Sequence, residues 1–235
     1  MKVCLYAFCT ITDSLFLPTV IELIALYGLT LLPHTGVGIL YLPTEAGKVE
    51  NLPDKAIEYD QFLSALSLHV TVLPVRFATI LQDISALLVW TEAHQKTIQQ
   101  KLTHLAGKVE YTLALKKQTI QPIESITSWS DVVAKLPTTA VRTYLTQKLT
   151  EYQLEVARQK TIATFVTTYL PALLKQATAH EILPSRGEMI LWEAVFLIDI
   201  PKLHDFMQIT ASIVPTPTYY LDCLGPWVCY HFANF

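Results

Sequence analysis

The chain has 235 residues, of which 51% are hydrophobic and 16% charged, and its formal net charge is −3. This length allows one large domain or two smaller ones and can bury a substantial core. The sequence has no block of basic residues, so it gives no support for nucleic-acid binding. Its high apolar content predicts surfaces that are buried or covered by a partner.

The first hundred residues alternate between apolar strand patterns and helical patterns. Residues 3–11 are apolar without polar alternation, which is typical of a strand buried on both faces. The next predicted elements are a helix over 15–27, a strand over 37–42, a helix over 54–69, a strand over 72–77 and a helix over 80–105. This alternation predicts an N-terminal α/β domain on a small sheet, residues 1–106.

The apolar stretch over residues 14–32 is long enough to raise the question of a membrane span. Pro18 and Glu22 lie inside it, and its flanks carry no anchoring charges. The stretch therefore favours a buried helix and no membrane association.

The strand predicted at residues 72–77 contains one arginine in an apolar run. Alternation places Arg76 on the face opposite Phe77. An arginine in such surroundings needs a carboxylate partner or a route to water. One hypothesis pairs Arg76 with Glu110, and the alternative extends the side chain to solvent beside a helix end.

The second half begins with an alternating strand over residues 108–116, which we take as the start of a C-terminal domain, residues 107–235. A polar linker is predicted at 118–137, followed by a long amphipathic helix over 141–177 that Pro171 should interrupt. A strand over 189–198, a helix capped by Asp199 and a strand over 218–224 complete the pattern. If one strand lies undetected between 183 and 198, this is a ferredoxin-like domain, and the fold class is α+β with two domains.

No constellation of catalytic residues stands out. The seven histidines are scattered, and the four cysteines form no metal-binding motif. Cys229 and His231 would point the same way on a strand, but no third group orients them. The sequence therefore predicts no metal, no cofactor and no catalytic residue, and the cysteines are expected to be free thiols in a reducing cytosol.

Three separated motifs resemble one family. They are VLPVRFATI at 72–80, GKVEYTL at 107–113 and LGPWVCYHF at 224–232. Together they resemble the gas vesicle accessory proteins of the GvpF/GvpL family, with patterns VLP-x-RFG-T, G-K-x-E and GPWPPYSF. Departures are Ala78 in place of glycine, and Val228, Cys229 and His231 in place of proline, proline and serine.

The resemblance implies a non-enzymatic, cytoplasmic protein associated with gas vesicles and needed for their assembly. Its implied partners are the major, very hydrophobic shell protein and other gas vesicle accessory proteins. The implied fold is two α/β domains, the second ferredoxin-like. From the residues alone, two alternatives stay open. One is a small-molecule-binding regulatory α+β protein whose ferredoxin-like half senses a ligand, and the other is an enzyme that uses Cys229 and His231.

Two groups of residues are singled out for a role. The structural motif group comprises Leu73, Pro74, Arg76, Phe77, Glu110, Gly225, Pro226, Trp227, Tyr230 and Phe232. In one hypothesis the Gly225–Trp227 turn is a clasp that packs Trp227 and Tyr230 between domains, and in the other Trp227 and Phe232 are exposed and bind the shell subunit. The partner-binding group, which could instead be core, comprises Leu15, Phe16, Val20, Leu23 and Tyr27.

Overall fold

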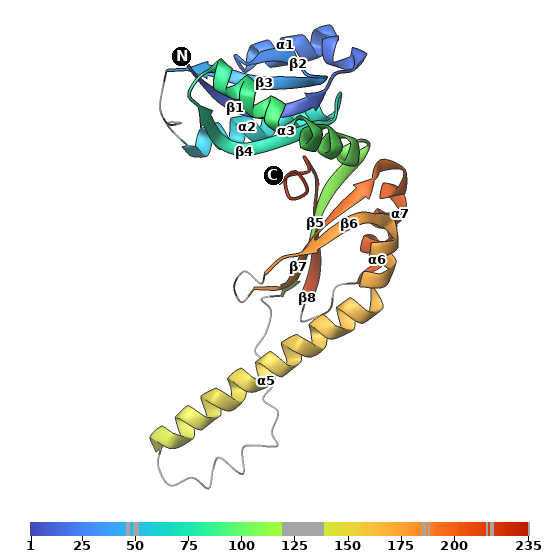
Figure 1. Ribbon diagram of the computed structural model, residues 1–235. Coiled ribbons are helices and arrows are strands. Elements are labelled where there is room, and N and C mark those ends of the chain that lie inside the picture. Colours follow the sequence, from blue (N-terminus) through green and yellow to red (C-terminus); the bar gives the residue numbers. More distant parts are fainter. Residues whose placement is uncertain are drawn as a thin grey trace. The chain divides into compact units, whose positions relative to one another are not determined.

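The computed structural model of the chain describes residues 1–45, 48, 52–118, 139–184, 187, 189–214, 216 and 219–234 (Figure 1). The chain forms two compact units. The first comprises residues 1–111, 197–201 and 224–235, and the second comprises residues 112–196 and 202–223. The terminal segment therefore belongs with the N-terminal unit, whereas the sequence-based division placed it in the second domain.

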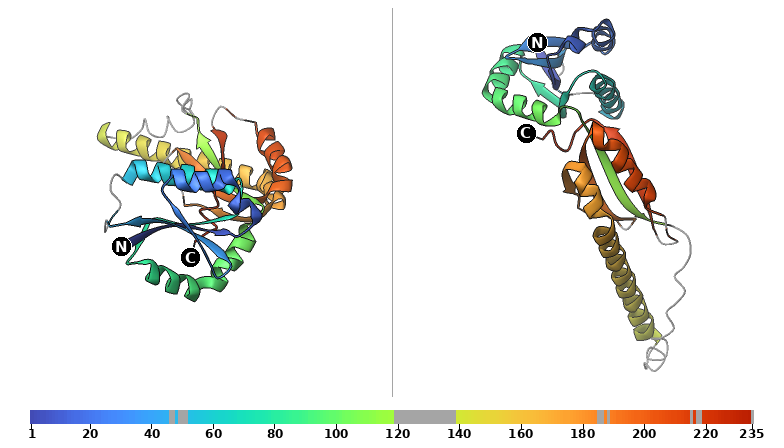
Figure 2. Two further views of the ribbon diagram at one scale, coloured as in Figure 1. Left: turned by 90° about the horizontal axis from the view of Figure 1, so that it is seen from above. Right: turned by 90° about the vertical axis from the view of Figure 1, so that its right-hand side faces the viewer.

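The first unit is built on a four-stranded sheet with the strand order β2-β3-β1-β4. Helices α1 and α2 cover one face of this sheet, and α3 covers the opposite face (Figure 2). The elements are β1 (Lys2–Thr10), a 3-10 turn (Asp13–Phe16), α1 (Pro18–Leu26), β2 (Thr30–His34), β3 (Val37–Thr44), α2 (Leu52–Ser67), β4 (Val72–Leu81) and α3 (Ile84–Leu105).

This sheet is antiparallel, because β1 pairs antiparallel with both β3 and β4, and β2 with β3. The α/β alternation predicted from the sequence lacked β2, an edge strand that contains Pro33. Thr35 and Gly36 join β2 to β3 with φ angles of 48° and 82°. Two successive positive φ angles are the conformation of a tight hairpin turn, which reverses the chain between neighbouring strands.

The core of the first unit lies on both faces of β1. On one face, Leu15, Ile24 and Phe62 pack in a single apolar cluster with the side chains of β1. On the other face, the ring of Phe8 stacks on Trp90 of α3 with ring centres 5.8 Å apart. Burial on both faces explains why residues 3–11 show no polar alternation.

The second sheet has the strand order β6-β7-β5-β8. Its elements are β5 (Lys108–Lys117), α5 (Thr139–Thr168), α6 (Leu170–Gln176), β6 (Ala177–Ile182), β7 (Ile190–Asp199), a 3-10 turn (Ile200–Lys202), α7 (Leu203–Ser212) and β8 (Tyr219–Trp227). A strand-helix-strand-strand-helix-strand sequence in this order is the ferredoxin-like arrangement. The predicted fold class is thus confirmed, but the undetected strand lies at 177–182, before the range 183–198 in which it was expected.

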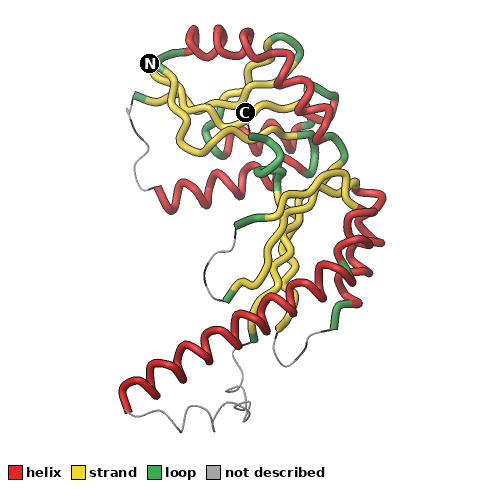
Figure 3. Tube along the Cα trace, turned by 60° about the horizontal axis from the view of Figure 1, so that its bottom comes forward, coloured by secondary structure: helices red, strands yellow, loops and turns green. Residues whose placement is uncertain are grey.

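Helices α6 and α7 lie against the same face of the second sheet (Figure 3). Phe165 of α5 packs against Trp192, and Phe206 of α7 packs against Phe196, with ring centres 5.0 and 5.5 Å apart. Trp192 and Phe196 both belong to β7, so this central strand anchors both helical segments.

The helix predicted at 141–177 is two helices, since the chain breaks at Tyr169 just before Pro171. The expected continuous apolar stripe is not buried: among the described side chains of α5, Phe165 alone is buried. Asp199 does not cap α7, which starts after a 3-10 turn with Lys202 at the N-cap. The polar linker predicted at 118–137 lies, apart from Gln118, outside the described residues.

Within the described ranges, no helix is long and apolar enough to cross a membrane. The apolar stretch that raised this question folds as the 3-10 turn, α1 and the start of β2.

Candidate functional site

The edge strand β4 bulges away from β1 where the arginine motif lies. Leu5 pairs with Thr79, and Ala7 pairs with Pro74. The four β4 residues 75–78 therefore stand opposite the single residue Tyr6. This bulge turns the Arg76 side chain outward and leaves its guanidinium exposed.

Tyr59 of α2 ties the bulge to β1. Its hydroxyl lies 3.1 Å from the carbonyl oxygen of Tyr6 and also contacts the carbonyl oxygen of Val75. Both carbonyls lie where the ladder between the strands is interrupted, so Tyr59 supplies a donor that the sheet cannot. Burial raises the pKa of the Tyr59 hydroxyl, which keeps it protonated as a donor.

Ala78 closes the bulge with a φ of +64°. This left-handed conformation is costly for a residue with a Cβ atom and favours glycine. The family pattern has glycine at this position, because a residue without a Cβ atom adopts a positive φ angle without steric strain.

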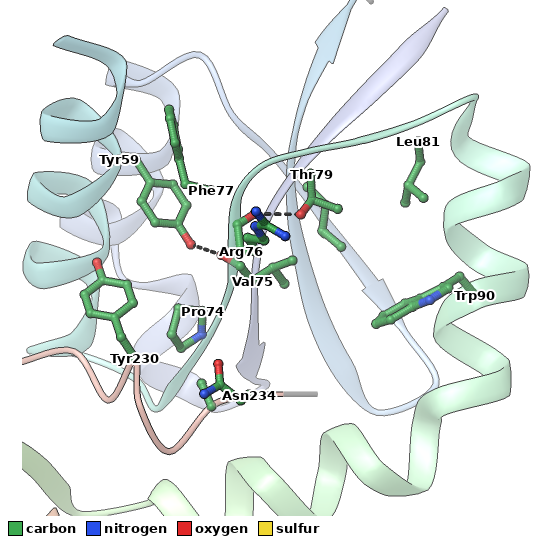
Figure 4. A pocket seen from close by; sticks show the side chains of 12 residues that line it. Tyr59, Pro74, Val75, Arg76, Phe77, Thr79, Leu81, Trp90, Tyr230 and Asn234 are labelled. Carbon is green, nitrogen blue, oxygen red and sulfur yellow. Dashed lines mark hydrogen bonds between the residues drawn. The ribbon is translucent and has the colours of Figure 1, made fainter. Parts of the chain in front are cut away.

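A pocket of about 540 Å³ opens beside the bulge (Figure 4). It lies between β4, Trp90 of α3 and the terminal segment, and most of its lining side chains are apolar or aromatic. Arg76 is the one charged residue in its lining, and we call this hollow the β4 pocket. Its lining residues are Leu5, Tyr59, Pro74, Val75, Arg76, Phe77, Thr79, Leu81, Trp90, Tyr230, Ala233 and Asn234.

The carboxylate of Glu110 holds the terminal segment. Glu110 is 2% exposed and accepts a hydrogen bond of 2.9 Å from the backbone N–H of His231. The Nδ1 atom of His231 lies 2.9 Å from its other oxygen. Burial raises the pKa of Glu110, and the bonds to His231 act in the opposite direction. The hypothesis that Glu110 pairs with Arg76 is therefore wrong, because His231 occupies the carboxylate and Arg76 faces solvent.

Further contacts fix the terminal segment on the first unit. The Tyr230 hydroxyl donates to Asp60 at 2.8 Å, and its ring packs 6.5 Å from that of Tyr59. Val228 and Ala233 are buried, and Lys101 donates to the carbonyl of Asn234. Tyr230 thus docks within the first unit, whereas the clasp hypothesis placed it between the two domains.

The other members of the terminal motif are less buried. Trp227 is 39% exposed, and Phe232 is half-buried. Part of the Trp227 ring is therefore open to solvent, and both roles expected for this residue stay predictions. Gly225 lies against Tyr111 and the backbone of Glu110 at a distance that only a residue without a side chain allows.

Helix α1 and the turn before it carry exposed apolar residues. Leu17, Ile21 and Ala25 follow one another four residues apart and are all exposed, so they share one outward face. Phe16 is 50% exposed and Leu26 is 80% exposed. We call these five residues the α1 face.

The predicted partner-binding group only partly coincides with this face. Leu15 and Val20 are fully buried, and Leu23 and Tyr27 pack against the core. Of the five, Phe16 alone is exposed. The stretch was identified correctly as apolar, but its sequence did not show which side of the helix faces the sheet.

Comparison with known proteins decides the family. The family model of gas vesicle synthesis proteins GvpL/GvpF matches residues 4–234. The chain belongs to the GvpL/GvpF family. No curated protein matches its sequence.

Two solved GvpF structures resemble the chain in fold. The gas vesicle protein GvpF from Anabaena sp. PCC7120 is 16% identical and superposes with a TM-score of 0.70, over 100% of this chain and 96% of that chain. GvpF from Microcystis aeruginosa, also 16% identical, gives a TM-score of 0.68, over 100% of this chain and 99% of that chain. At this identity the likeness establishes a shared fold.

The cysteine and histidine of the terminal motif do not form a reactive pair in this GvpL/GvpF member. The thiol of Cys229 lies 3.8 Å from the carbonyl of Lys108, and burial raises its pKa to about 12. A thiol with this pKa is not a nucleophile at neutral pH. His231 is directed at Glu110. No cluster of three or more potential metal ligands occurs among the described residues.

Sequence reasoning missed Tyr6, Tyr59 and Asp60 as parts of the site. Tyr59 and Asp60 lie in α2, and the spacing of apolar residues in this helix predicts only which of its sides faces the core. Their partners are 16 to 170 residues away, a separation that periodicity does not register.

Proposed function

We propose that this chain is a non-enzymatic accessory protein that binds the hydrophobic shell subunit of gas vesicles during their assembly. Family membership supports the gas vesicle context. The α1 face supports binding of an apolar partner, because exposed leucine, isoleucine and phenylalanine side chains concentrated on one short helix and the turn before it are typical of an interaction surface. This face is the observation that carries the proposal.

The physical role is to keep an apolar subunit from aggregating. A folded protein that covers apolar surface lowers the concentration of free, aggregation-prone subunit by mass action. The growing vesicle wall then competes for the same surface. We place the protein in the cytoplasm at the vesicle, where other accessory proteins are further candidate partners.

The proposal is tested by removing the apolar character of the α1 face. The double substitution Ile21→Ser and Leu26→Ser changes two exposed side chains, so the fold should persist. We expect this variant to lose binding of purified shell subunit in a pull-down and to lose suppression of subunit aggregation, measured by light scattering.

A matched control changes exposed apolar residues elsewhere in the first unit. Leu68 is 83% exposed and Val89 is 67% exposed, and neither belongs to the α1 face. The Leu68→Ser and Val89→Ser double variant should bind the shell subunit as the unsubstituted protein does. If the α1 variant binds equally well, this face is not the binding surface.

The regulatory alternative placed a ligand site in the ferredoxin-like half. The β4 pocket lies instead in the first unit and is lined mainly by apolar side chains. The enzyme alternative receives no support from Cys229, whose thiol is buried and protonated.

A further inference from the structure

We propose that the β4 pocket binds a small amphiphilic carboxylate, with its apolar chain inside the pocket and its carboxylate on Arg76. This site is separate from the α1 face and goes beyond the binding of a shell subunit. Its volume of about 540 Å³ falls in the range of small-molecule sites, roughly 300–1,000 Å³.

The walls of the pocket suit an apolar chain. Leu81 of β4 and Trp90 of α3 lie on the same side of the pocket (Figure 4). Leu5 of the neighbouring strand β1 also lines it. Ala233 contributes a buried apolar group from the terminal segment. Transfer of an alkyl chain onto such walls is favourable by about 0.8 kcal/mol per buried methylene group.

The charge of the pocket selects an anion. Arg76 is the charged residue of its lining, and no described carboxylate forms an ion pair with it. Glu110, the acidic residue that the sequence offered as a partner, is engaged by His231. A planar guanidinium binds a carboxylate through two parallel hydrogen bonds, which makes a carboxylate the preferred anion.

The remaining polar side chains of the pocket already have protein partners. The hydroxyls of Tyr59 and Thr79 donate to backbone carbonyls of β1 and β4. The hydroxyl of Tyr230 donates to Asp60, and the side-chain amide of Asn234 donates to the His231 carbonyl. A peptide would bring several amide groups that need partners, whereas an amphiphilic carboxylate brings a single polar group. The lining therefore favours the amphiphile.

The bulge holds this arrangement before any ligand binds. The left-handed Ala78 and the Tyr59 hydroxyl fix the backbone on both sides of Arg76. Binding then requires ordering of the arginine side chain and little rearrangement of the strand, which reduces the entropic cost of binding.

The test compares three decyl compounds on the full-length protein by titration calorimetry, with the two ionic compounds below their micelle concentrations and decan-1-ol below its solubility limit. Decanoate should bind, decan-1-ol should bind about tenfold more weakly, and decyltrimethylammonium more weakly still. Arg76→Gln should reduce decanoate affinity to that of the alcohol and leave alcohol binding unchanged. The conservative Arg76→Lys should recover part of the loss.

Two further measurements locate the site. Leu81→Trp fills the pocket and should weaken binding of both decanoate and decan-1-ol, and circular dichroism confirms that the variant is folded. The indole N–H signal of Trp90 should shift on decanoate addition in an NMR spectrum. Arg158→Gln, on α5 of the second unit, is the matched arginine control and should not change binding.

Equal affinities for decanoate and the alcohol, or unchanged binding in Leu81→Trp, would overturn the proposal. So would binding of an acetylated and amidated Leu-Leu-Glu peptide in the absence of decanoate binding. The α1 double variant should retain decanoate binding. A failure of the decanoate-binding proposal is therefore distinguishable from a failure of the shell-binding proposal.

Discussion

The Glu110 carboxylate meets both the backbone N–H and the imidazole of His231, each at 2.9 Å, across 121 residues of sequence. Glu110 is nearly inaccessible to water, so these donors replace the solvation that it loses. One side chain of β5 thus helps to fix the terminal segment, together with the contacts of Tyr230 and Lys101.

Replacing Glu110 with alanine should destabilise the protein strongly. The substitution leaves the backbone N–H of His231 without its acceptor and creates a cavity where the buried Glu110 side chain lay. We expect a loss of about 2–4 kcal/mol in the free energy of unfolding, measured by urea denaturation. Tyr230 and Ala233 should become accessible to protease cleavage at the same time.

Glu92→Ala is the matched control for this substitution. Glu92 is on α3 of the same unit, pairs with His34 at 3.2 Å, and its side chain is 58% exposed. An exposed ion pair of this type contributes about 0–1 kcal/mol. Similar losses in the free energy of unfolding for Glu92→Ala and Glu110→Ala would show that the buried contacts of Glu110 stabilise the protein no more than an exposed ion pair does.

The contribution of Glu110 should also depend on pH. Burial raises the pKa of this carboxyl above its ordinary value, so the folded protein binds its proton more tightly than the unfolded chain does. Its contribution to stability is therefore complete below the ordinary pKa and falls as pH rises through the raised pKa.

Comparison with Glu110→Gln, which does not titrate, isolates this effect. The free energy of unfolding of the original protein minus that of the glutamine variant should decrease as the pH rises above the ordinary pKa of glutamate, by at most about 1.4 kcal/mol per pH unit. A difference that grows with pH would show that the bonds from His231 outweigh burial.

Ala78→Gly should stabilise the protein. At a φ of +64°, the Cβ atom of alanine lies too close to the backbone, and this contact destabilises the folded state. Glycine has no Cβ atom and avoids the contact. Glycine also makes the unfolded chain more flexible, so the net gain should be about 0.5–1 kcal/mol, measured by thermal unfolding. Ala106→Gly is the control, since its φ of −57° offers no strain to relieve and the substitution should destabilise.

Gly225→Ala should be more damaging than the same change at another positive-φ glycine. A Cβ atom on Gly225 would lie 2.9 Å from the Glu110 carbonyl oxygen and 2.7 Å from the Tyr111 ring. A Cβ on Gly107 meets nothing within 4 Å, although its φ is +67°. We expect losses of about 1 kcal/mol for Gly107→Ala and more than about 2 kcal/mol for Gly225→Ala. Equal losses of stability in the two variants would show that the positive φ angle alone, and not the contact with Glu110 and Tyr111, causes the destabilisation.

The sequence carried enough information to predict the ferredoxin-like sheet. Residues 108–116 alternate strictly in sequence, and the neighbouring strand β7 is an apolar run of strand length. The strand β6 escaped detection because it follows α6 directly and is mostly exposed, so its residues continue a helical-looking stretch. β2 escaped for a related reason, since a short edge strand with a proline lacks a strand pattern.

The site was predictable only in part. The arginine motif was recognised as unusual, and the need for a partner or solvent followed from its apolar neighbours. Whether Arg76 has a carboxylate partner or faces solvent depends on the bulge opposite Tyr6. The only sign of this bulge in the sequence is Ala78, which lies at a position where the family pattern has glycine. Likewise, Glu110 was identified as a carboxylate that needs a partner, but spacing does not indicate a contact with His231.

The docking of residues 224–234 on the first unit has a consequence for synthesis. Ribosomes release the chain from its N-terminus, so β1 to β4 emerge long before Tyr230 and His231. Until those residues appear, Glu110 has no donor from the tail, and the surface that Val228 and Ala233 cover is open. The N-terminal unit can therefore reach its final stability only after translation of nearly the whole chain.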